Sequence, residues 1–292
     1  MSDSSPALML GLTLPDVAQW SDRVTVALGQ NPGMFTGPGT NTYLVGTGPE
    51  RILLDTGDGR PEYLPILARA LEAAGEVRIQ EIVLTHGHPD HIGGAASVLE
   101  THGSVPVSKR PWPELDARHP VTIRPIDDGD VLRTEGATIR AIHTPGHAED
   151  HLCFLLEEEG ALFSGDNVLG VGTTVIPPFG GDLGDYMRSL DRLLAQEPTA
   201  IYPAHGPKIE DGPGKLREYI EHRQERERQV LAALDAGPTS IAEIVKEVYA
   251  AYPEAIHAAA ASTVTTQLLK LEAEGQVARE GEDPLAARWR RA

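Results

Sequence analysis

Seven histidine and aspartate residues in four separate segments constrain most strongly what this chain can fold into. The first segment, residues 84–91, reads LTHGHPDH and places four of the seven within six positions. The other three each follow a short apolar stretch farther along the chain. Imidazoles and carboxylates are ligands that suit zinc and its first-row neighbours. The candidate metal ligands are His86, His88, Asp90, His91, His147, Asp166 and His205.

The spacing within the first segment predicts two metal positions. If His86 and His88 continue an extended strand, their side chains point the same way, because strand side chains alternate with period two. They would hold one ion together with His147. The residues beyond Pro89, Asp90 and His91, would hold a second ion with His205, and Asp166 would bridge both. We expect two divalent metal ions, and zinc because histidine dominates, although such a donor set also suits iron or manganese.

Three further residues are candidates for supporting these ligands. A metal-bound histidine usually donates its other ring N–H to a nearby acceptor. Asp55 ends the expected strand 51–55 and is the first candidate acceptor, with Thr85 the next. A turn residue that ends a strand is the equally favoured alternative for Asp55. His151 is expected to support the site or the structure without binding metal.

Alternating apolar runs and turn signals predict a layered α/β fold. Strands that end at candidate ligands, followed by helices twice over, are typical of a sandwich of sheets and helices. Helical periodicity predicts helices over residues 62–74 and 183–195. The expected strands are residues 24–28, 42–45, 51–55, 81–84, 138–142, 152–156, 161–163 and 200–202.

The composition changes after His205 and predicts a small separate module. A charged helix over about 215–234, the breaker Gly237-Pro238, two more helices and two short strands indicate a winged-helix-like module. The expected divisions are an N-terminal lead-in (1–20), a catalytic domain (21–212), a connecting helix (213–237) and the module (238–292). The module has six Lys/Arg against eight Asp/Glu, a net charge of −2. Only residues 288–291 (RWRR) are basic, with Trp289 as an aromatic that could stack on a base.

Charge and composition restrict the partners. The formal net charge of −18 opposes extended nucleic-acid binding, because phosphate contacts supply most of that affinity. The one cysteine, Cys153, lies in an apolar run and is expected to be a buried strand thiol. Neither a secretory signal nor a membrane-length apolar stretch is present, so we expect a cytoplasmic protein with no membrane partner. A homodimer remains open.

The ligand segments resemble the signature of the metallo-β-lactamase superfamily, in its glyoxalase II-like branch. The resemblance implies an αββα sandwich with two metals in a cleft, where a hydroxide that bridges the metals attacks the substrate. It also implies catalytic roles for Asp90 and Asp166. Asp166 is similar to the bridging carboxylate of glyoxalase II, which true β-lactamases of this fold generally lack. Antibiotic hydrolysis is therefore not expected.

Further segments narrow the resemblance to two groups of this branch. Residues 28–48, 134–138, 163–166 and 172–175 resemble the group of beta-lactamase-like protein two, described as endoribonucleases that prefer single strands. The chain is also similar to fungal polyketide thioesterases, which release products from an acyl carrier protein. The first hypothesis is therefore an endoribonuclease on single-stranded RNA. The alternative is a hydrolase of a thioester or small acyl ester, and a non-catalytic winged-helix binding protein is the least favoured. One departure is Gly87, where these relatives often have tryptophan.

Overall fold

The chain divides into two compact units in the computed structural model. The structure describes residues 11–237, 239–251, 253 and 257–292. Unit 1 comprises the described residues up to Thr144, Asp150–Thr174 and Leu193–Lys215, and unit 2 comprises Pro145–Glu149, Val175–Arg192 and the described residues from Leu216 onward. Within the described residues, no helix is long and apolar enough to cross a membrane.

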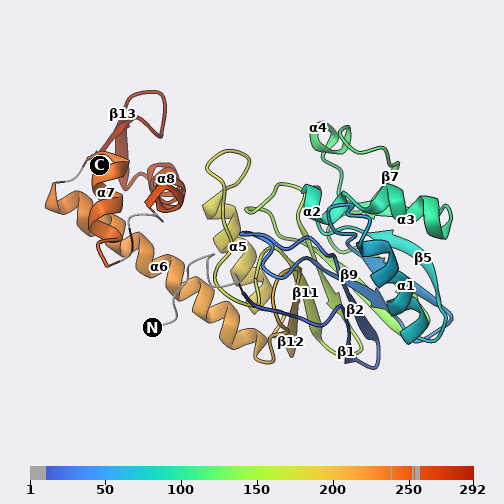
Figure 1. The fold of residues 1–292 in the computed structure, drawn as a ribbon. Helices are drawn as coiled ribbons and strands as arrows, with labels where there is room; N and C mark the ends of the chain where they lie inside the picture. The colour runs from blue at the N-terminus through green and yellow to red at the C-terminus, as the bar shows by residue number, and fades with distance from the viewer. Residues whose placement is uncertain (1–10, 238, 252, 254–256) are drawn as a thin grey trace. The chain divides into compact units, whose positions relative to one another are not determined.

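Unit 1 is built on two β-sheets. The larger has seven strands in chain order, antiparallel from β1 to β4 and parallel from β4 to β7 (Figure 1). Its strands are β1 (Val17–Ser21), β2 (Val24–Leu28), β3 (Asn41–Val45), β4 (Glu50–Leu54), β5 (Arg78–Val83), β6 (Val107–Lys109) and β7 (Ile123–Pro125). The smaller has the order β12-β11-β10-β9-β8. Its strands are β8 (Val131–Thr134), β9 (Ala137–His143), β10 (Leu152–Leu156), β11 (Ala161–Gly165) and β12 (Ala200–Pro203).

Apolar side chains from the two sheets form one shared core. Val26 and Tyr43 of the first sheet pack in the same buried cluster as Phe154 and Phe163 of the second. Burying such residues is the main source of stability in a layered fold. The other face of the seven-stranded sheet is covered by α1 (Tyr63–Ala73) and α3 (Ala95–His102). The layered α/β class expected from the sequence is therefore confirmed.

The strands explain why the candidate ligands gather. Parallel strands β4 and β5 end side by side, with Leu54 opposite Val83, so the residues that follow them leave the same edge of the sheet. The first ligand segment comes just after β5, and the short helix α2 (Pro89–Ile92) then carries Asp90 and His91. His147 follows β9, Asp166 follows β11, and His205 follows β12. All four segments therefore begin at strand ends.

Two expectations about unit 1 need correction. The loose lead-in expected over residues 1–20 contains a strand, because β1 pairs with β2 antiparallel; residues 1–10 lie outside the described residues. The residues of β1 are partly exposed, so the sequence VAQWS lacks the clear apolar pattern that predicts a buried strand. Also, β5 ends at Val83, so His86 and His88 belong to a loop and not to a continued strand. Close contacts within that loop, and not strand alternation, set the direction of their side chains.

Most of unit 2 consists of helices and a two-stranded wing. The helices are α5 (Leu183–Leu194), α6 (Gly212–Ala236), α7 (Ile241–Val248) and α8 (His257–Ala273), and the wing strands are β13 (Val277–Glu280) and β14 (Arg288–Arg291). Ser240 starts α7 with a capping box, in which its side chain and that of Glu243 each bond the other's backbone N–H. The helix–helix–wing order confirms the winged-helix-like module. The breaker residue Pro238 lies outside the described residues.

The structure decides whether Trp289 is available to stack on a base. Its side chain is completely buried in the core of the module, among residues of α6, α7 and α8. Its ring N–H donates to the carbonyl of Pro284 at 3.3 Å. Trp289 therefore cannot stack on a base in this structure. The alternation of β14 leaves its arginines outside and turns the tryptophan inward.

Candidate metal centre

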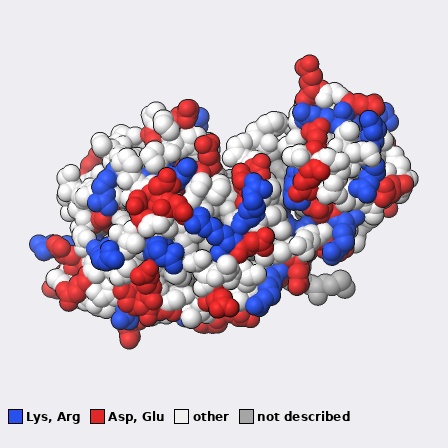
Figure 2. Space-filling model, turned by 180° about the vertical axis from the view of Figure 1, so that it is seen from behind, with Lys and Arg blue, Asp and Glu red and all other residues white. Residues whose placement is uncertain are grey.

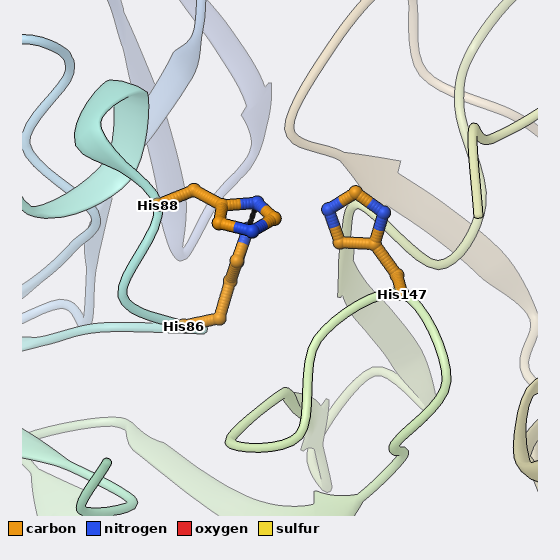
Figure 3. Close-up of side chains that lie close together, drawn as sticks. All are labelled: His86, His88 and His147. Carbon is orange, nitrogen blue, oxygen red and sulfur yellow. Dashed lines mark hydrogen bonds between the residues drawn. The ribbon is translucent and has the colours of Figure 1, made fainter. Parts of the chain in front are cut away.

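The candidate ligands form two groups, and the first consists of three histidines. Ligand atoms of His86, His88 and His147 all lie within 4.8 Å of one another. Figure 3 shows the ring of His147 facing the rings of His86 and His88 across a gap. His86 Nε2 and His88 Nδ1 are 2.9 Å apart. His147 Nδ1 donates to the carbonyl oxygen of Val175 at 2.8 Å, which leaves Nε2 with a lone pair for a ligand.

The second group combines two histidines with two carboxylates. The ligand atoms of Asp90, His91, Asp166 and His205 also lie within 4.8 Å of one another. His205 Nε2 is 3.1 Å from Asp166 Oδ1 and 3.3 Å from Asp90 Oδ2. His91 Nε2 is 3.4 Å from Asp166 Oδ1 and 3.7 Å from Asp90 Oδ2. The structure therefore gathers all seven candidates, with Asp166 in the second group, and its bridging role stays a prediction.

The electrostatics of the second group favour a positive charge between its carboxylates. Burial opposes protonation of His205, but Asp166 and Asp90 outweigh it and raise its pKa to about 9. Burial likewise opposes ionisation of Asp90, but His91 and His205 lower its pKa to about 2. The pKa of His91 is raised well above its usual value, because the nearby carboxylates outweigh its burial. In the first group burial lowers the pKa of His86 well below its usual value, so that imidazole is neutral, as a metal ligand must be.

Asp55 and Thr85 connect histidines of the two groups. Asp55 Oδ2 lies 2.8 Å from His91 Nδ1, and Asp55 Oδ1 accepts the backbone N–H of Thr85 at 2.8 Å. The hydroxyl of Thr85 lies 2.9 Å from Asp55 Oδ2 and 3.0 Å from His86 Nδ1. All four side chains are buried. One carboxylate and one hydroxyl thus orient a histidine in each group.

His151 contacts the site through the backbone of a candidate ligand. Its Nε2 accepts the backbone N–H of Asp166 at 3.1 Å, and its Nδ1 lies 2.9 Å from the hydroxyl of Thr144. His151 belongs to neither ligand group. Its supporting role stays a prediction.

Sequence reasoning missed Thr40, which supports the second group. Its hydroxyl donates to the carbonyl oxygen of Asp90 at 3.0 Å, and its backbone forms a β-bridge with His205. Asn31 holds Thr40 in turn, because its side-chain oxygen accepts the Thr40 N–H at 2.8 Å. The polar run Thr40-Asn41-Thr42 at the start of a buried strand was the only local signal.

The donor atoms fit a divalent cation. His91 Nδ1 faces Asp55, so Nε2 is the free donor atom of that ring, and it is buried without a hydrogen bond in the part of the chain that the structure describes. It faces one oxygen each of Asp90 and Asp166. This arrangement is expected where a bound cation would be coordinated by the nitrogen and both oxygens. Five imidazoles and two carboxylates are compatible with zinc, iron or manganese. The fold and this donor set define the chain as a metal-dependent hydrolase with a winged-helix module.

Comparisons with known proteins identify the family. Residues 35–205 match the metallo-beta-lactamase superfamily, and residues 240–289 match the beta-lactamase associated winged helix domain. The chain belongs to the metallo-beta-lactamase superfamily. The lactamase-like protein adaB of Aspergillus niger is 43% identical over 295 residues, which cover 94% of this chain and 88% of that protein.

Two further relatives bear on activity and architecture. An atrochrysone carboxyl ACP thioesterase of Claviceps purpurea is 44% identical over 226 residues, which cover 76% of this chain and 68% of that protein. Among solved structures, a metallo-beta-lactamase family protein of Thermus thermophilus has a TM-score of 0.73 at 27% identity, covering 96% of this chain and 99% of that one. The similarity to the Thermus thermophilus protein extends over both the sandwich and the winged helix.

Proposed function

We propose that this hydrolase cleaves a thioester between an acyl group and the thiol of an acyl carrier protein. The observation that carries the proposal is the 44% identity with a relative that is named as an ACP thioesterase, over 76% of this chain. The gathered His and Asp side chains supply a site suited to hydrolysis. The thioester alternative is therefore preferred to the endoribonuclease hypothesis.

Charge and burial argue against RNA as the substrate. The net charge is −18, and on the face in Figure 2 basic side chains are interspersed with acidic ones. The one aromatic of the basic C-terminal segment, Trp289, is buried. A strand of RNA needs a basic track or exposed stacking surfaces for affinity. A thioester on a carrier protein needs neither.

We assign the two metal positions to the two side-chain groups. His86, His88 and His147 would hold one cation, and Asp90, His91, Asp166 and His205 the other. When bound, two such cations, zinc in our proposal, would activate water and polarise the carbonyl of the substrate. Asp55 and Thr85 keep His86 and His91 in orientations that turn their other ring nitrogens toward the site.

The two carboxylates have different exposures and, we propose, different roles. The side chain of Asp90 is 26% exposed and that of Asp166 is 13% exposed. Asp90, besides its place in the second ligand group, can therefore contact and orient the attacking water, while the more buried Asp166 also keeps His91 and His205 in place. The leaving thiol has an ordinary pKa of about 8.5, so it departs as a thiolate with little help from an acid.

The test is an assay of thiol release. Zinc-loaded protein is mixed with an acyl-pantetheine thioester and an acyl-carrier-protein thioester, and the free thiol is titrated with a chromogenic disulfide. Cys153 is buried and should not contribute to the signal. We expect turnover that falls at least about a thousandfold in Asp90→Ala and Asp166→Ala, because each removes a ligand from the second group.

End-labelled single-stranded RNA is tested in parallel. Strand cleavage by the wild-type protein that is absent in a folded Asp166→Ala protein, without thioester hydrolysis, would contradict the proposal and restore the endoribonuclease hypothesis. Glu197→Gln, a change at an exposed loop position, is the control for losses of activity that arise from mutagenesis and purification alone. It should keep wild-type thiol release.

A further inference from the structure

A group of buried charges lies beside Gly87, in the loop that carries His86 and His88, and takes no part in the ligand groups. The Lys109 side chain, at the end of β6, is completely buried. Its ammonium donates to Asp150 Oδ2 at 2.5 Å and to the carbonyl of Arg110 at 2.7 Å, and it lies 2.8 Å from Asp116 Oδ1. Asp150 is also completely buried, and the Asp116 side chain is 14% exposed. One lysine and two aspartates leave this triad with a net charge of −1.

The triad lies against the backbone that carries two candidate ligands. A Cβ added at Gly87 would be 3.2 Å from Asp150 Oδ2 and 2.8 Å from a methyl group of Leu115. Gly87 is the residue between His86 and His88. Leu115 belongs to the short helix α4 (Pro113–Asp116), which the ion pair between Asp116 and Lys109 holds in place. The space that a side chain at position 87 would need is therefore occupied, which is a physical reason for glycine there.

The first ligand group lacks a negative charge of its own. It has three imidazoles, whereas the second group has two carboxylates. A divalent cation held by neutral imidazoles keeps its full charge, and burying such a charge is costly unless an opposite charge lies close by. In a buried region this attraction is screened much less than in water. Asp150 Oδ1 is buried and makes no hydrogen bond to another residue in the described part of the chain.

We propose that the Lys109–Asp150–Asp116 triad is a positioning and charge-compensating element for the first metal position. Asp150 lies against the Gly87 backbone, which joins His86 to His88, limits where that backbone can move, and supplies negative charge beside the carboxylate-free ligand group. Lys109 keeps Asp150 ionised and ties it to β6. The proposal rests on the metal ligands assigned under the proposed function.

The ionisation of Asp150 depends on its lysine. Burial raises the pKa of Asp150, and the charge and hydrogen bond of Lys109 oppose that rise. A buried ion pair loses much of its attraction to desolvation and is weak evidence for a role in stability. Its location against the loop between two ligands makes a role in metal binding the better account.

The experiment measures metal affinity and not turnover. Metal-free Asp150→Asn is titrated with Zn²⁺ against a competing chelator, and both dissociation constants are compared with the wild type. Asn keeps the shape of the side chain and removes its charge. We expect the affinity for one equivalent, the metal held by His86, His88 and His147, to fall about 10- to 100-fold, the range found when a residue that supports a metal ligand is removed.

Two further variants locate the effect. Glu81→Gln is the matched control, because Glu81 is a buried carboxylate of the same sheet that pairs with Arg124 and Ser108 and contacts no candidate ligand. It should leave both affinities unchanged. In His88→Ala, which disables the first group, adding Asp150→Asn should not weaken the remaining equivalent further. An equal loss in both backgrounds would overturn the assignment to the first position.

The remaining outcomes separate the inference from the proposed function. Two metals bound with wild-type affinity by folded Asp150→Asn would overturn the inference alone. A wild-type protein that binds no metal would instead contradict the ligand assignment. If Asp150→Asn does not fold, Lys109→Met with Asp150→Met removes both charges and keeps apolar volume. That variant must still bind one equivalent, the metal at the first position, more weakly than the wild type, and wild-type affinity for both metals would also overturn the inference.

Discussion

At the scale of single residues, the site depends on side chains that hold ligands in place. Asp55 has a positive φ of 58°, a conformation that aspartate and asparagine adopt more readily than most residues. That backbone turn directly follows β4 and directs the carboxylate toward Thr85 and His91. Local strain is retained where surrounding contacts compensate for it. Here the compensation comes from three hydrogen bonds to one carboxylate.

Asp55→Asn should weaken metal binding without unfolding the protein. Asparagine tolerates the same backbone conformation, but its neutral amide is a poorer acceptor for the N–H of His91. We expect the affinity for one metal equivalent to fall about 10- to 100-fold. The measurement is a chelator-competition titration, with the exposed Asp127→Asn as the control. Unchanged affinity in Asp55→Asn would show that the carboxylate only ends the strand.

Cys153 should be unreactive in the folded protein. Burial raises the pKa of its thiol to about 12, and thiols react as thiolates. The expected result is no reaction with a disulfide reagent at pH 8 over hours, and one thiol per chain after unfolding in guanidinium. Because Cys153 is the one cysteine of the chain, any thiol that the reagent detects is that of Cys153. Rapid reaction of the native protein would contradict the buried position.

At the scale of secondary-structure elements, short-range rules act most clearly at α7. Ser240 and Glu243 form a capping box at its start, and Glu243 Oε2 accepts the backbone N–H groups of Ser240 and Thr239 at 3.0 and 3.1 Å. The wing is tied to the same turn, because the N–H of Trp289 donates to the carbonyl of Thr239 at 2.7 Å. The start of one helix therefore also positions a strand.

Ser240→Ala should destabilise the C-terminal module. Losing a serine cap costs about 1 kcal/mol, because a backbone N–H of the first turn loses its acceptor. Hydrogen exchange of α7 and the wing measures the change in the free energy of local opening. Thr239 contributes to this turn through its backbone, so Thr239→Ala is the matched control. Equal protection in wild type and Ser240→Ala would contradict the role of the cap.

Glu243 should make the stability of the module depend on pH. Bonds from the N–H groups of Ser240 and Thr239 lower its pKa to about 2, below its ordinary value of 4.5. A lowered pKa stabilises the fold above pH 4.5, and this stabilisation is lost as pH falls from 4.5 through 2. The stability difference between wild type and Glu243→Gln should therefore shrink between pH 5 and pH 3 in denaturant titrations. A constant difference would contradict this.

At the scale of the whole molecule, metal binding should stabilise the fold of unit 1. The second ligand group brings two buried carboxylates together, and a ligand that binds only the folded state stabilises it by mass action. At a hundred times its dissociation constant, a metal adds about 2.7 kcal/mol. Removing it with a chelator should lower the melting temperature by about 5–10 °C, and zinc should restore it.

A ligand variant separates this effect from general effects of the chelator. Asp166→Ala lacks one carboxylate of the second group, so the chelator should lower its melting temperature by less. Scanning calorimetry of both proteins, with and without chelator, gives the comparison. Equal shifts in the two proteins would show that Asp166 does not contribute to metal binding.

Local patterns in the sequence are sufficient to identify the residue types of the site and most of its elements. The helices around 62–74 and 183–195 and the strands 24–28 and 152–156 agree closely with α1, α5, β2 and β10. Periodicity and turn residues act over a few positions, so they can be read locally. The ligand segment at 84–91 is likewise a local pattern. The residues that match the metallo-beta-lactamase superfamily, 35–205, include this segment.

Which of these residues meet depends on the folded chain as a whole. The spacing predicts the two ligand groups, but their residues come from four separate strand ends that only the folded chain brings together. The pairing of β1 and the Lys109–Asp150–Asp116 triad have no local signal. Each depends on contacts between segments far apart in the chain, which packing and burial select. A sequence pattern identifies residues that could make such contacts. The contacts that form are those present in the fold of lowest free energy, in which the native contacts support one another.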